Sequence, residues 1–104
     1  MAFADNLRQL PSIAHLAALH VRDAAGQRVA SIENQPGKAG SLAVYAALAA
    51  RHGHIDAAAA QEGLELFAEH TADARARPGA HPNIDRLLQV IATGQTLQVE
   101  LVPA

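Results

Sequence analysis

The stretch of sequence that decides the fold is Ile32-Glu33-Asn34-Gln35-Pro36-Gly37-Lys38-Ala39-Gly40-Ser41-Leu42. It is a cluster of Asn, Pro and Gly with a lysine at its centre. It separates a β-like segment from an alanine-rich helical region. A glycine turn that leads into a helix can hold an anion through its backbone N–H groups. This turn is therefore the first place to look for a binding site.

The segments before the turn predict a short helix followed by a β-hairpin. Phe3, Leu7 and Leu10 share one helical face, and Pro11 ends the helix. Residues 16–33 then form the hairpin, because apolar and polar side chains alternate on either side of turn residues 23–27.

The segments after the turn predict two helices in succession. Ser41 is expected to cap the first, which ends at Gly53 after a stripe of apolar residues at helical spacing. Asp56 is expected to cap the second, which continues for several turns until residues 77–79 stop it. Gly63 lies inside this second helix, where it predicts close packing or a local irregularity.

The end of the chain predicts one more helix and the clearest strand. Asn83 is expected to cap the helix and Gly94 to end it, and residues 97–101 alternate as in a strand. The predicted order is α-β-β-α-α-α-β. This order predicts an α+β fold in which a three-stranded sheet has helices packed on one face, within a single domain of residues 1–104. The last strand could join either edge of the hairpin.

Composition narrows the classes of protein. The 104 residues carry 8 basic and 10 acidic side chains for a net charge of −2, which argues against a nucleic-acid partner. Without cysteine there is no disulfide, thiol nucleophile or thiolate metal site. We expect no signal peptide and no membrane-spanning segment, and hence a cytoplasmic protein. Because aromatic residues are only 3% of the chain, we also expect a modest core and self-association as a homodimer.

Two polar segments are the candidate ligand site. The turn offers backbone N–H groups and a lysine, but it is not a P-loop, because the P-loop lysine follows its last glycine. The segment His81-Pro82-Asn83-Ile84-Asp85-Arg86 is the second cluster of hydrogen-bonding side chains. If the segments meet in space, they form a mixed polar pocket. The predicted ligand residues are Asn34, Gly37, Lys38, Gly40, Ser41, His81, Asn83, Asp85 and Arg86.

A metal site is an alternative, because six histidines in 104 residues are unusual. His52, His54 and Asp56 lie two residues apart at a helix–helix corner, and His-x-His-x-Asp is reminiscent of metallohydrolase ligand runs. Imidazole and carboxylate ligands suit zinc, with a more distant histidine completing the site. The local interpretation is a helix-end cation for His52, a loop residue for His54 and an N-cap for Asp56.

Nucleic-acid binding is a further alternative. Gly37-Lys38-Ala39-Gly40 matches the Gly-x-x-Gly of KH domains, which clamps a nucleotide backbone, and the predicted order is similar to that of the bacterial KH variety. In KH domains this pattern joins two helices, whereas here a strand and a proline precede it.

The chain as a whole resembles a family of short bacterial proteins of unknown function. The resemblance rests on residues 3–7, 32–45, 69–75 and 81–87. It implies a stand-alone bacterial protein and brings no activity, cofactor or catalytic residue. The first interpretation is thus a non-catalytic binding or protein-interaction module with no expected cofactor. The alternatives are a metal-dependent hydrolase and a KH-like binder, so the sequence leaves open whether the protein is an enzyme.

Overall fold

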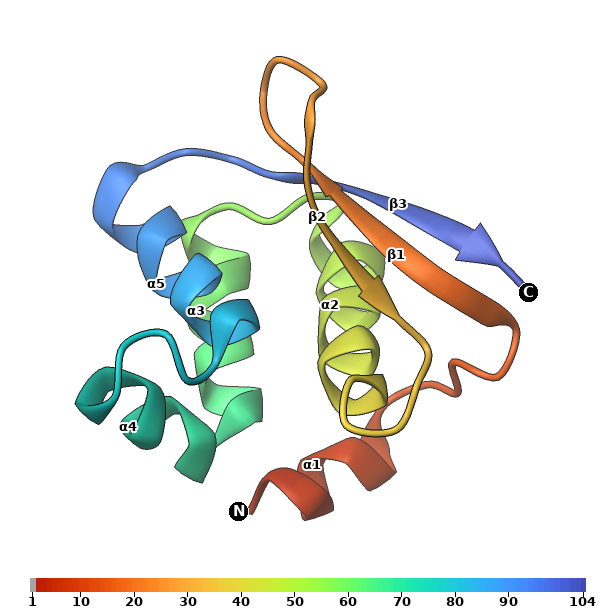
Figure 1. Ribbon diagram of the computed structural model, residues 1–104, viewed down its shortest axis with the longest axis horizontal. Coiled ribbons are helices and arrows are strands. Elements are labelled where there is room, and N and C mark those ends of the chain that lie inside the picture. The colour runs from red at the N-terminus through yellow and green to blue at the C-terminus, as the bar shows by residue number, and fades with distance from the viewer. Residues whose placement is uncertain (1) are drawn as a thin grey trace.

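The computed structural model describes residues 2–104, which form five helices and three strands (Figure 1). In chain order the elements are α1 (Phe3–Gln9), β1 (Leu16–Arg22), β2 (Arg28–Glu33), α2 (Ala39–His52), α3 (Ala57–Phe67), α4 (Glu69–Ala76), α5 (Pro82–Thr93) and β3 (Gln98–Pro103). The predicted α+β class and the order of helices and strands are confirmed.

The sheet is antiparallel, with strand order β2-β1-β3. β3 joins the free edge of β1, which answers the question that the sequence left open. Leu19 in the central strand lies opposite Ile32 on one side and Leu101 on the other. Figure 1 shows α2 lying against one face of the sheet, with α3 and α5 on the far side of α2.

α2 is the centre of the core because it is covered on two sides. Leu42, Val44, Tyr45 and Leu48 are fully buried between the sheet and the other helices. Gly63 of α3 makes the second contact possible. A Cβ there would lie 2.6 Å from Leu87 Cδ1 and 2.9 Å from Leu48 Cδ1. The close packing predicted for Gly63 is therefore present.

The long helix predicted from Asp56 is two helices, α3 and α4, separated at Ala68. Ala68 has φ 52°, in the left-handed region that residues other than glycine seldom adopt. Thr71 satisfies the end of α3, because its buried hydroxyl donates to the Leu64 carbonyl at 2.6 Å. The break thus depends on a side chain from the following helix.

Of the three predicted N-caps one is confirmed and two are wrong, whereas both predicted glycine ends are confirmed. Asp56 caps α3 by accepting the Ala59 N–H at 2.9 Å, and Gly53 and Gly94 follow α2 and α5 in the left-handed conformation. The N-cap residues of α2 and α5 are Lys38 and His81, and neither makes a side-chain cap. Ser41 and Asn83 lie inside these helices instead.

Within residues 2–104, none of the helices combines the length and the apolar character needed to cross a bilayer.

Candidate functional site

A cavity of about 420 Å³ lies where α1, the start of α2, the α3–α4 junction and the loop before α5 meet. Its lining consists of Phe3, Leu7, Gly37, Gly40, Ser41, Phe67, His70, Ala80, His81, Pro82, Asn83 and Ile84. Members of both polar segments singled out in the sequence therefore face one cavity. Segments more than 40 residues apart in the chain supply its walls.

One wall of the cavity is aromatic. Phe3 stacks on Phe67 with ring centroids 5.4 Å apart, and the Phe3 ring meets His70 edge-on at 5.0 Å. Gly40 permits this arrangement, because a Cβ at its position would lie only 3.0 Å from Phe3 Cζ. The glycine at the start of α2 thus allows α1 to approach closely.

α1 closes this side of the cavity although none of its residues is fully buried. The Phe3 N–H donates to Glu69 Oε1 at 2.8 Å, and Asn6 Nδ2 donates to the Leu66 carbonyl at 3.0 Å. The hydrogen bond from Phe3 lowers the pKa of Glu69 below its ordinary value. These contacts hold α1 against the junction of α3 and α4.

His81 is held in place by α4. Its Nε2 lies 2.6 Å from Asp73 Oδ2, and Arg77 Nε donates to the other carboxylate oxygen at 2.9 Å. Hydrogen bonds from Arg77 and then His81 lower the pKa of Asp73 strongly. The His81 ring also lies 5.7 Å from that of His70, so imidazoles from two segments are neighbours at the cavity.

Behind the cavity, Tyr45 connects α2 to α5. Its hydroxyl is buried, donates to the Asn83 carbonyl at 2.5 Å and accepts from Arg86 at 3.0 Å. Arg86 also donates to Asn83 Oδ1 at 2.9 Å and stacks over the Tyr45 ring, 5.6 Å from its centroid. Burial is the main reason that the pKa of Tyr45 rises to about 12.

Five of the nine predicted ligand residues line the cavity, and the other four lie outside its lining. The five are Gly37, Gly40, Ser41, His81 and Asn83.

Of the remaining four, Arg86 makes the contacts described above. Asn34 Nδ2 donates to the carbonyls of residues 13 and 16, and Asp85 Oδ2 accepts the Gly79 N–H at 2.9 Å. Lys38 is exposed at the N-cap of α2.

Sequence reasoning missed the aromatic side of the site. The spacing of Phe3 places it only on an apolar helix face, and neither Phe67 nor His70 is among the predicted ligand residues. The available signal was composition, because Phe3 and Phe67 are two of only three aromatic residues in the chain. No local pattern indicated that α1 would dock beside residue 67.

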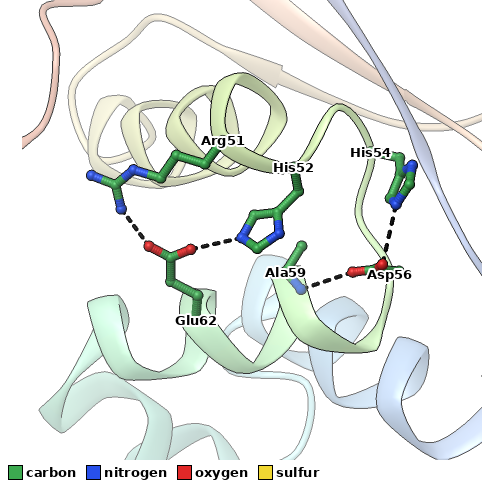
Figure 2. Close-up of polar contacts among 6 residues, drawn as sticks. All are labelled: Arg51, His52, His54, Asp56, Ala59 and Glu62. Carbon is green, nitrogen blue, oxygen red and sulfur yellow. Dashed lines mark hydrogen bonds and ion pairs between the residues drawn. The ribbon is translucent and has the colours of Figure 1, made fainter.

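The predicted metal ligands do not converge (Figure 2). His52 Nε2 lies 2.7 Å from Glu62 Oε1 on α3, whereas His54 Nε2 pairs with Asp56 Oδ2 at 3.1 Å. No group of three or more His, Asp or Glu side chains suited to a metal occurs among the described residues. The structure therefore does not support the metal-dependent hydrolase.

These residues stabilise the corner between α2 and α3 instead. Glu62 accepts from His52 and Arg51, and these two contacts lower its pKa despite partial burial (Figure 2). The pKa of Asp56 is lowered chiefly by the Ala59 N–H that it caps and next by His54. The local interpretation of Asp56 as an N-cap is thus confirmed.

The Gly-x-x-Gly pattern occupies a different place from that in KH domains. It connects a strand, β2, to a helix, α2, rather than joining two helices. Gly40 is moreover packed against Phe3. This geometry does not favour the KH-like binder.

The fold and cavity define a small α+β protein with a mixed aromatic and polar site. The chain belongs to a family described as uncharacterized protein conserved in bacteria (DUF2322), whose model matches residues 3–101. No curated protein and no solved structure matches the chain.

Proposed function

We propose that the protein is a non-catalytic binding module that holds a small molecule in the cavity. The observation that carries this proposal is that Gly37, Ser41, His81 and Asn83 line a cavity of about 420 Å³ together with aromatic rings. Ligand sites typically have volumes of roughly 300–1,000 Å³ and combine an apolar lining with a few convergent polar groups.

Several groups around the cavity that could serve in catalysis are already engaged in structural contacts. Asp73 binds Arg77 and His81, and Asp85 accepts the Gly79 N–H. A binding role needs only the donors and rings that line the cavity. A binding role does not require Asp73 or Asp85 to be released from these contacts, whereas acid–base chemistry by either residue would.

The test is a fragment screen followed by two-dimensional amide NMR on the labelled protein. Fragments that bind should shift the amide signals of Gly37, Ser41 and Ala80. Ala80→Leu, which places a larger side chain at the exposed rim of the cavity, should weaken binding, whereas Ala25→Leu in the exposed hairpin turn should not. Shifts confined to other surfaces, or equal affinity in both variants, would contradict the proposal.

We also propose a single domain over residues 1–104, a cytoplasmic location and self-association as a homodimer. The alanine-rich composition, which contributes little apolar area per residue, supports self-association. Light scattering after size exclusion at low micromolar concentration tests self-association, which a purely monomeric mass would contradict.

A further inference from the structure

We propose that the ligand of the cavity is a small aromatic carboxylate, whose ring lies against Phe3 and whose carboxylate faces Ser41 and Asn83. This inference rests on the proposed function and adds the class of ligand. Three features of the described residues carry it: an aromatic wall, donors that no protein group uses, and an arginine without an acidic partner.

The aromatic wall fits a flat ring better than an aliphatic chain. Phe3 and Phe67 are already stacked, and the His70 ring stands edge-on to Phe3. All three side chains line the cavity. A ligand ring could extend this group by offset or edge-to-face contacts, which add stabilisation beyond the burial of apolar area.

The polar side chains of the lining include donors that no protein acceptor uses. None of them is a carboxylate. Arg86 donates to Asn83 Oδ1, which directs the amide NH₂ group away from the guanidinium and leaves it available. Within residues 2–104, the Ser41 hydroxyl and the His70 ring make no hydrogen bond with protein groups. A ligand that accepts hydrogen bonds would therefore complete the lining.

The charge behind these donors is positive. Arg86 is half-buried, and its hydrogen-bond partners, the Tyr45 hydroxyl and Asn83 Oδ1, are neutral. None of the ion pairs among the described residues includes Arg86. An anion near Asn83 would gain from this charge, because a partly buried site screens it less than bulk water does.

The acidic groups nearest the cavity keep their negative charge, but each is bound by a donor other than Ser41 and Asn83. Glu69 accepts the Phe3 N–H, Asp85 accepts the Gly79 N–H, and Asp73 is bound by Arg77 and His81. Arg86 is thus the charged group that bonds Asn83 directly, at the polar end where the ligand carboxylate would lie. A cationic ligand would find no free carboxylate among the side chains of the lining.

Four matched compounds test the class of ligand: benzoate, cyclohexanecarboxylate, benzamide and benzylamine. Affinities come from amide NMR titrations of the full chain. We expect benzoate to bind about tenfold more tightly than the non-aromatic acid and about tenfold more tightly than the neutral amide. Benzylamine should not shift the cavity amides.

Two variants test separately how the aromatic wall and the charge of Arg86 contribute to ligand affinity. Phe3→Leu should reduce the preference for benzoate over cyclohexanecarboxylate and leave the preference over benzamide. Arg86→Met should reduce the preference for benzoate over benzamide and leave the preference over cyclohexanecarboxylate. Arg28→Met, which removes an exposed arginine from the hairpin, should change neither preference. Because Arg86 also supports Tyr45, Ser41→Ala gives a second test of the polar end: it should weaken benzoate more than benzamide.

The outcomes distinguish the two proposals. If benzylamine or cyclohexanecarboxylate binds at the cavity as tightly as benzoate, the class of ligand is wrong and the binding module stands. If none of the compounds, and no fragment from the wider screen, shifts the cavity amides, both proposals fail.

Discussion

The Tyr45 hydroxyl gives the sharpest test of how the cavity is supported. It is buried between α2 and α5, donates to the Asn83 carbonyl at 2.5 Å and accepts from Arg86 at 3.0 Å. Tyr45→Phe keeps the ring and removes only this oxygen. The substitution therefore leaves one carbonyl without its donor and one guanidinium with one acceptor fewer, and it opens no large cavity.

A buried polar group left without its partner costs roughly 1–3 kcal/mol, and we expect Tyr45→Phe to lower the free energy of unfolding by about 2 kcal/mol. The value stays below the upper end because Arg86 keeps Asn83 Oδ1 as an acceptor. In a domain of this size, such a loss lowers the melting temperature by about 10 °C.

Urea unfolding followed by far-ultraviolet circular dichroism measures the effect. The control is Thr93→Val, which also removes a hydroxyl but from an exposed site, where it donates to the Gln89 carbonyl and accepts the Gln95 N–H. That variant should change stability by less than about 0.5 kcal/mol. If Tyr45→Phe costs no more than Thr93→Val, the link between α2 and α5 does not depend on this oxygen, and the reasoning is refuted.

Three further predictions concern titration and capping. Because burial raises the pKa of Tyr45 from 10.0 to about 12, the unfolded chain loses its proton first, so stability present below pH 10 should fall by about 2 kcal/mol as the pH rises to 12. Urea midpoints across that range check this, and Tyr45→Phe should abolish the dependence. Asp56→Ala should lower the melting temperature by about 5 °C, whereas Asp56→Asn keeps an acceptor for the Ala59 N–H and should lose less. The pKa of Glu62 is lowered mainly by His52, so its contribution is present above its ordinary value of 4.5 and lost as the pH falls below it. Glu62→Gln should therefore unfold with a shallower acid dependence than the natural chain in calorimetric scans.

Local signals predicted the parts of the fold that depend on neighbouring residues. The hairpin, the Asp56 cap and the glycines after α2 and α5 each follow from turn or capping chemistry within a few positions. The pairing of β3 with β1 does not, because both edges of a hairpin offer unpaired backbone groups. Only the packing of the whole chain chooses between them.

The wrong caps show how a strong local residue can be used differently. Ser41 and Asn83 are good N-cap residues, yet α2 begins at Ala39 and α5 at Pro82. Asn83 instead accepts from Arg86 one turn later and gives its carbonyl to Tyr45. These partners lie on two helices. The sequence predicted that Asn83 belongs to the site. It did not predict that its carbonyl and Oδ1 would be engaged and its amide NH₂ group available.

The partners of the histidines likewise could not be predicted from local sequence. Four of the six pair with carboxylates, as His20–Glu100, His52–Glu62, His54–Asp56 and His81–Asp73. The number of histidines suggested a metal site. Each pair, however, joins one imidazole to one carboxylate and connects two elements or two positions of a turn. No third ligand lies beside any pair among the described residues. His70 is different, because it faces the cavity beside Phe3 and has no carboxylate partner among the described residues. Because no acid among the described residues holds its ring, we expect His70, rather than the paired histidines, to contact a ligand in the cavity.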